Sequence, residues 1–288
     1  MAMLRLVTAA QAASVDAALL ASPGFTLDVL VEVAGIACAE AIAAVYPPSS
    51  HRRALVLVGP GNNGLDGLVA ARWMRAYGFE PTVVSPRATG GTGDGARVYA
   101  NLLQQLQWSQ VPILRVLPGA AGDVAAHADV IIDAVFGFSF KRGTGVRAPY
   151  DALLDYMRDA AELEAAPIAA GDSMPSSGPT LARSVARGSG VPVVSIDVPS
   201  GWDVDDAPTC ASGDVLSAPS LRPSMLISLT APKPCSARFD GPHHWFGGRF
   251  VPPAVLAAHG ITLPPFAGAS HAVSIGRPRR GCGAGTEA

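Results

Sequence analysis

Charge is scarce in this chain of 288 residues, in which 21 Lys and Arg and 23 Asp and Glu make up 15% of the sequence. Only two of the basic residues are lysine, Lys141 and Lys233. With a net charge of −2, the sequence favours neither a broadly basic surface for nucleic acid nor a polybasic membrane anchor. Hydrophobic residues account for 49% of the chain, which is enough for a large buried core.

Cysteines and long apolar runs are also sparse. The four cysteines lie far apart and form no C-x-x-C pair, so we expect reduced thiols rather than disulfides or structural zinc. No apolar run reaches about 18 residues, and residues 1–13 do not have the pattern of a signal peptide. These features predict a cytoplasmic protein and leave a mitochondrial location open.

Strand-like apolar runs alternate with helical segments along the chain. Strands are expected at 54–58, 81–84, 113–116, 130–135, 191–198 and 225–229. Helices are expected at 9–20, 27–45, 66–77, 95–106 and 149–159, the first two forming an N-terminal helical pair. This alternation predicts an α/β fold: a Rossmann-like, doubly wound, mostly parallel sheet with helices on both faces.

The pattern predicts a single domain over residues 1–276. Residues 160–190 are rich in small and turn-forming residues and are expected to form a surface insertion, and residues 277–288 are expected to be a disordered tail. The pair His243 and His244 precedes Trp245 in an expected edge strand. We interpret these histidines as solvated or packing residues rather than metal ligands.

The loop after the first strand contains G-x-G-x-x-G at Gly59, Gly61 and Gly64. A dinucleotide-binding fold would place an acidic residue about 20 positions further on, but the second strand ends at residues 85–87 without a carboxylate. Asp66 would repel a phosphate, and no G-K-[ST] follows, which excludes a P-loop. A plain glycine-rich turn between strand and helix remains an alternative.

Two further polar clusters follow strands. Asp133 precedes Gly137-Phe138-Ser139-Phe140-Lys141, and Asp197 lies in Ser195–Asp203 together with Ser200. Because ligands of open α/β sheets bind outside the carboxyl ends of the strands, we expect these clusters and the glycine loop to meet in one crevice. Their Asn, Asp and Ser oxygens suit a hard cation better than zinc. Each aspartate taken alone could instead cap a helix.

Three long segments resemble, in the correct order, the signatures of the NAD(P)H-hydrate epimerases, the YjeF N-terminal domain family. They are Gly59–Gly67 (GPGNNGLDG), Val130–Lys141 and Ser195–Asp203. Weaker similarity continues through residues 229–233 and 246–253, and the helical start through 32–35 is also similar. Leu65 stands where the family usually has glycine.

The resemblance implies an isomerase that interconverts the R and S hydrates of NADH and NADPH, so that a separate dehydratase can restore the cofactor. It implies Asp197 as the catalytic residue and one potassium ion per subunit, held by Asn63, Asp133 and Ser200. The residues it implies in substrate binding are Asn62, Asn63, Gly64, Leu65, Asp66, Gly137, Phe138, Ser139, Phe140, Lys141, Arg142, Gly143 and Asp197.

The small-molecule substrate is the expected partner, with no nucleic acid and no membrane, and a homodimer remains open. The main alternative is a non-catalytic scaffold of the same fold, of the RNA-decapping or lipoprotein-binding type. A conventional NAD-dependent dehydrogenase is third, because of the missing carboxylate at residues 85–87. Ring opening and reclosure is an alternative to loss and return of the hydroxyl group.

Overall fold

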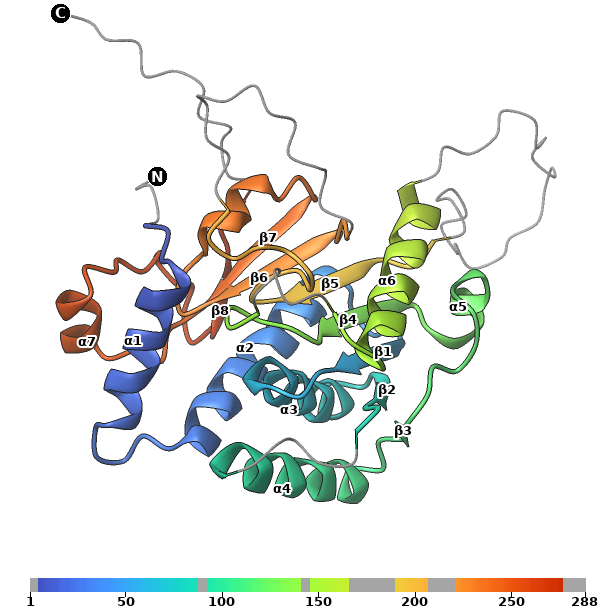
Figure 1. Cartoon of the computed structure of the whole chain (residues 1–288), viewed down its shortest axis with the longest axis horizontal. Coiled ribbons are helices and arrows are strands. Elements are labelled where there is room, and N and C mark those ends of the chain that lie inside the picture. Colours follow the sequence, from blue (N-terminus) through green and yellow to red (C-terminus); the bar gives the residue numbers. More distant parts are fainter. Residues whose placement is uncertain (1–4, 88–92, 141–145, 166–189, 207–220, 277–288) are drawn as a thin grey trace, which may run out of the picture.

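The strands of the described residues form one twisted sheet in the order β3-β2-β1-β4-β5-β6-β7-β8 (Figure 1). The computed structural model describes residues 5–87, 93–140, 146–165, 190–206 and 221–276. All neighbouring strands are parallel except β7 and β8, which are antiparallel. The strands are β1 Arg53–Val58, β2 Glu80–Val84, β3 Ile113–Leu114, β4 Val130–Ala134, β5 Val193–Ile196, β6 Met225–Leu229, β7 His243–Gly247 and β8 Ala272–Ser274.

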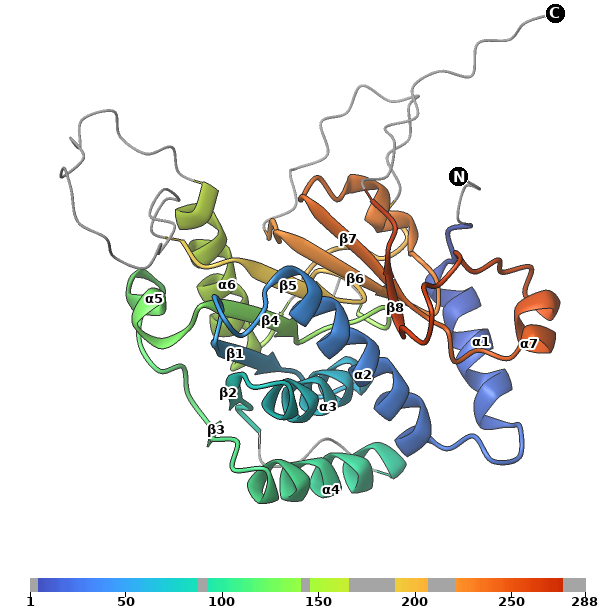
Figure 2. The same ribbon diagram turned by 180° about the vertical axis from the view of Figure 1, so that it is seen from behind.

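Helices cover both faces of the sheet (Figures 1 and 2). Side chains of α2, α3 and α4 pack with alternate residues of the strands in one core cluster, whereas α6 packs with the intervening residues in another. The helices are α1 Ala9–Leu20, α2 Leu27–Val45, α3 Asn62–Ala76, α4 Asp94–Trp108, α5 Val124–His127, α6 Tyr150–Ala165 and α7 Pro253–Ala258, with 3-10 turns at Ala121–Asp123 and Pro234–Arg238. The expected doubly wound, mostly parallel α/β fold is confirmed.

The order of the sheet determines where a ligand can bind. The chain starts at β1, moves outward to β2 and β3, and then crosses back to β4 on the other side of β1. Such a reversal leaves a crevice at the carboxyl ends of the two central strands. Among the described residues, no helix is long and apolar enough to cross a membrane.

The N-terminal helical pair is confirmed, and local sequence accounts for both starts. Thr8 and Gln11 form a capping box at α1, in which the Gln11 N–H donates to Thr8 Oγ1 over 3.3 Å. Thr26 caps α2 by accepting from the Val29 N–H. The helix α1 lies beside α7 in both views, where Ser14 Oγ is 3.2 Å from His259 Nε2 (Figures 1 and 2).

Some expected boundaries are wrong. The helix α3 begins at Asn62 rather than at 66, because Gly61 serves as the N-cap and the Gly64 N–H donates to the Gly61 carbonyl. Helix α6 continues to Ala165, so the first residues of the expected insertion are helical. The rest of that insertion, 166–189, and the expected tail, 277–288, lie outside the described residues.

The strand at His243–Gly247 is not the edge strand that the sequence predicts, because β8 pairs along its outer side. The short β8 has too few residues to show an alternating pattern. His244 is buried and lies 3.0 Å from Ser228 Oγ through Nε2, and burial lowers its pKa to about 4. His244 is therefore a packing residue, as interpreted.

Candidate active site

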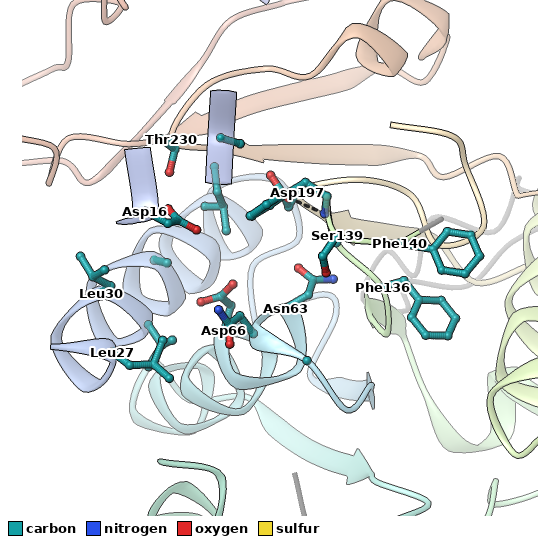
Figure 3. A pocket seen from close by; sticks show the side chains of 18 of the residues that line it. Asp16, Leu27, Leu30, Asn63, Asp66, Phe136, Ser139, Phe140, Asp197 and Thr230 are labelled. Carbon is teal, nitrogen blue, oxygen red and sulfur yellow. Dashed lines mark hydrogen bonds between the residues drawn. The ribbon is translucent and has the colours of Figure 1, made fainter. Parts of the chain in front are cut away.

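A pocket of about 620 Å³ opens at the carboxyl ends of β1, β4, β5 and β6 (Figure 3). The helices α1 and α2 close it on the side away from the sheet, through apolar side chains such as Leu20, Leu30 and Val31. All three polar clusters singled out in the sequence contribute to its lining. The polar residues of the lining are Asp16, Asn62, Asn63, Asp66, Ser139, Asp197, Thr230 and Lys233.

The glycine loop forms the floor of this pocket because its backbone approaches β4 closely. A Cβ at Gly59 would lie 1.7 Å from the Val135 carbonyl oxygen, so this position requires glycine. Gly64 has a similar constraint against the Gly59 carbonyl, at 2.2 Å. This close packing places the first turn of α3 at the crevice, with Asn62, Asn63 and Asp66 lining it.

Asp133, near the end of β4, is fully buried and accepts four hydrogen bonds. Its carboxylate accepts from Ser195 Oγ at 2.8 Å, from the Ser200 N–H at 2.9 Å, and also from Ser200 Oγ and the Val135 N–H. Burial raises the pKa of Asp133, and the donors from Ser200 and Ser195 oppose that rise. Ser200 Oγ in turn accepts from the Phe136 N–H at 2.9 Å, so this network fixes the loop after β4.

Asn63 is 6% exposed, and neither polar atom of its side-chain amide has a hydrogen-bond partner in the described part of the chain. An unsatisfied buried amide is costly, and it marks a place where a ligand or ion can supply the missing contact. Asn63 lies against the same loop that Ser200 holds, since a Cβ at Gly137 would be 3.1 Å from the Asn63 Cβ. The structure therefore brings Asn63, Asp133 and Ser200 to one loop.

Asp197 is the best-anchored carboxylate facing the pocket. It follows β5 in the left-handed backbone conformation, with φ of 65°, which aspartate tolerates better than most residues. Its Oδ2 accepts from the Phe138 N–H at 3.2 Å, and its Oδ1 forms an ion pair with Lys233. Lys233 is 2% exposed and also donates to the Leu229 carbonyl at 2.8 Å.

Two further carboxyl groups face the same space. The pKa of Asp16 is raised to about 6, mainly by burial. The charge of Lys233 opposes this rise, and the charge of Asp197 adds a smaller one. Burial, followed by the charges of Asp197 and Asp16, raises the pKa of Asp66 well above its usual range. The pocket thus combines three carboxyl groups, from α1, α3 and the end of β5, with one ammonium group.

The family follows from comparison with known proteins. A family model described as "YjeF-related protein N-terminus" matches residues 27–235. The chain belongs to this family. The crystal structure of yeast YNL200c superposes with a TM-score of 0.74 at 30% identity, covering 94% of this chain and 100% of the yeast chain.

A curated relative of this YjeF family member is "Pyridoxine/pyridoxamine 5'-phosphate oxidase 1, chloroplastic" from Arabidopsis thaliana. It is 38% identical over 274 residues, which is 94% of this chain and 45% of the relative. The chain therefore spans less than half the length of that curated relative.

The structure places the YjeF signature residues in three groups. Asn62, Asn63, Asp66, Gly137, Phe138, Ser139, Phe140 and Asp197 line the pocket. Gly64, Leu65, Asp133 and Ser200 do not. Leu65 is 2% exposed and packs in the core between α2, α3 and the sheet, and Asp133 and Ser200 are buried in the network that fixes the loop after β4. Lys141, Arg142 and Gly143 lie outside the described residues.

Sequence reasoning missed the two charged residues Lys233 and Asp16 of this YjeF-family pocket. The signal for Lys233 was its rarity, because a chain that uses arginine almost throughout has only two lysines. Asp16 is the single charged residue in the otherwise uncharged helix AAQAASVDAALL. Lys233 ends the weakly similar segment 229–233, whereas Asp16 lies in no segment that resembles the family, so the fold was needed to place both in the pocket.

Proposed function

We propose that this chain is an NAD(P)H-hydrate epimerase, which interconverts the R and S forms of hydrated NADH or NADPH so that a separate, stereospecific dehydratase can restore the cofactor. One observation carries the proposal: the three family signatures, far apart in the sequence, all contribute side chains to a single pocket. The volume of about 620 Å³ lies in the range of small-molecule and cofactor sites.

The chemistry suits a carboxylate-lined pocket. In the hydrate, C6 carries both a hydroxyl group and the ring nitrogen. Loss of the hydroxyl, helped by a proton, gives a cation that the ring nitrogen stabilises, and water returning to the other face inverts C6. Carboxylates near C6 stabilise that cation and transfer the protons.

Asp197 is the proposed proton-transfer residue. The Phe138 N–H and Lys233 each hold one of its oxygens, so its carboxyl group is fixed in orientation before the substrate arrives. Lys233 is itself fixed by the Leu229 carbonyl. Phe138 lies beside both groups, with Lys233 Nζ 5.5 Å from the centre of its ring. This arrangement favours a defined position for the reacting ring.

We also propose a potassium ion in this site. Its donor set would be the Asn63 amide oxygen together with the Asp133 and Ser200 oxygens, and the unpartnered buried amide of Asn63 fits this role. Oxygen donors of this kind suit hard cations. When bound, the ion would supply a fixed positive charge that orients neighbouring groups. The chain's own residues carry out the proton transfers.

A non-catalytic scaffold of the same fold is a weaker proposal. A buried ion pair contributes little net stability, and a buried carboxyl with a raised pKa costs stability. The buried pair Asp197–Lys233 and the buried Asp66 therefore do little to stabilise the fold, and a protein without a ligand in this pocket would not need them. The oxidase name of the Arabidopsis relative belongs to a protein that this chain covers by less than half, and we do not extend it to this chain.

The test is direct exchange between separated R and S hydrates of NADH and of NADPH, followed by chromatography. We expect the purified chain to equilibrate each pure epimer much faster than the uncatalysed exchange in the same buffer. The matched control is Asp155→Asn, a change of an exposed carboxylate on α6. Exchange no faster than in buffer alone, with properly folded protein, would refute the proposal.

A further inference from the structure

Asp16 lies on the wall of the pocket that none of the sequence signatures supplies. It belongs to α1, which precedes the range 27–235 matched by the family model. Figure 3 shows its carboxyl group turned into the pocket that Asp197 also lines. Asp16 is half-buried, and none of the described residues makes a hydrogen bond to its side chain.

The surroundings of Asp16 are those of an acid–base group. From α3 it faces Asp66, from the end of β5 Asp197, and from the loop after β6 Lys233. On its outer side α1 contacts α7, where the neighbouring polar pair is Ser14 with His259. Burial among these groups raises the pKa of Asp16 to about 6, close to the range in which a proton carrier works best.

Inversion at C6 makes a demand that a single carboxylate does not meet. The hydroxyl leaves from one face of the ring and water arrives on the other. A proton donor is therefore required on the first face and a proton acceptor on the second. Asp16 comes from α1 and Asp197 from the end of β5, so the pocket offers a carboxyl group from each of two separate elements.

We propose that Asp16 is the acid–base residue for one face of the ring, and Asp197 the acid–base residue for the other. The inference rests on the proposed epimerase function and deepens it. In one direction the Asp16 carboxyl gives its proton to the C6 hydroxyl, the C6–O bond breaks, and its electron pair leaves with the water molecule. The ring nitrogen lone pair forms the C=N bond of the cation.

The second half of the reaction restores the electron count. A water oxygen attacks C6 from the face of Asp197, the C=N electrons return to nitrogen, and the Asp197 carboxylate takes a proton from that water. One water is released and one consumed, and one proton has passed from Asp16 to Asp197. The reverse direction uses the same two groups with their roles exchanged. Solvent returns the proton between turnovers.

The test compares Asp16→Asn, which removes the acid, with Asp16→Glu, which keeps a carboxyl group, and with the exposed control Asp155→Asn. We expect kcat of Asp16→Asn to fall by about 10²-fold or more in both directions, with KM changed by less than about threefold. Asp16→Glu should retain a measurable part of the activity, and Asp155→Asn all of it.

The pH profile supplies a second readout. Because Asp16 carries the proton that reaches the C6 hydroxyl, and burial raises its pKa to about 6, kcat/KM of the unmodified chain should fall above about pH 6. In Asp16→Asn this descending limb should disappear. A buffer-only control at each pH removes the uncatalysed exchange.

Each outcome decides. An unmodified chain that gives no exchange refutes the epimerase function itself. An active chain whose Asp16→Asn variant keeps its kcat, or loses activity only through KM, refutes the role of Asp16. If Asp16→Asn does not fold, the unmodified chain still provides a test: the absence of a descending limb above about pH 6 overturns the inference.

Discussion

Replacing Asp16 by asparagine is expected to stabilise the protein near neutral pH while it removes activity. Asp16 has an ordinary pKa of 3.8 that rises to about 6 in the folded chain, so the native state holds this proton more tightly than the unfolded chain does. Stability from this group is therefore present at low pH and declines as the pH rises from about 4 to about 6. Asparagine stays neutral at every pH and avoids that loss.

The size of the effect follows from the two pKa values. A shift of one unit corresponds to about 1.4 kcal/mol, so ionising Asp16 in place costs as much as about 3 kcal/mol of unfolding free energy at pH 7.5. At pH 4.5 Asp16 is mostly ionised in the unfolded chain and protonated in the folded chain, and this difference lowers the free energy of unfolding by only about 1 kcal/mol. The advantage of Asp16→Asn over the unmodified chain should therefore grow by about 2 kcal/mol between these pH values.

The assay is urea unfolding of both proteins at a series of pH values from about 4.5 to 7.5, followed by tryptophan fluorescence. Taking the difference between the two proteins at each pH cancels the titrating groups that do not interact with Asp16, including His244, whose lowered pKa acts in the opposite direction. Asp155→Asn should stay within about 0.5 kcal/mol of the unmodified chain throughout. A difference that is flat with pH, or that shrinks towards neutrality, would refute the electrostatic reasoning for Asp16.

Three further predictions test other parts of the site. Asp197→Asn should lower epimerisation by about 10²-fold. Asparagine accepts the positive φ of this position, but Tm should also fall because the buried Lys233 ammonium loses its carboxylate partner; near-normal exchange would move the catalytic role elsewhere. Gly137→Ala should push Asn63 aside and so weaken activation by potassium. The measurement is the rate of epimerisation in potassium, in lithium and in a bulky organic cation, and full activity without any small cation would contradict the proposed ion. Gly67→Ala should cost about 1–3 kcal/mol in urea unfolding, since its Cβ would lie 2.4 Å from the Ala134 Cβ, and an unchanged midpoint would show that α3 can move away from β4.

Local pattern was enough to predict most of the sheet. The continuous apolar runs of β1 and β4 are buried on both faces, and such short runs are typical of central parallel strands in a chain that alternates strands with helices. The position of the crevice could also be predicted, because Asp133 lies near the carboxyl end of β4 and Asp197 directly follows β5. The sequence therefore predicts the strands and the polar residues at their carboxyl ends.

Contacts between distant segments could not be predicted in this way. Lys233 reaches Asp197 across two strand ends, and Asp16 reaches the pocket from a helix at the start of the chain. The start of α3 was misjudged because polar Asn62 and Asn63 have the composition of a loop, whereas the first turn of a helix can equally be polar. The three residues of β8 join the sheet through pairing with β7 and have no periodicity of their own.

The helix α1 is attached to the molecule by a small apolar cluster of its own, separate from the clusters on the two faces of the sheet. Val15 and Leu19 of α1 pack there with Leu30, Val251 and Ile261. One wall of the pocket can therefore change in sequence without disturbing strand pairing. Substitutions on the α1 side of the pocket and substitutions in the core of the sheet therefore fall on different sets of positions.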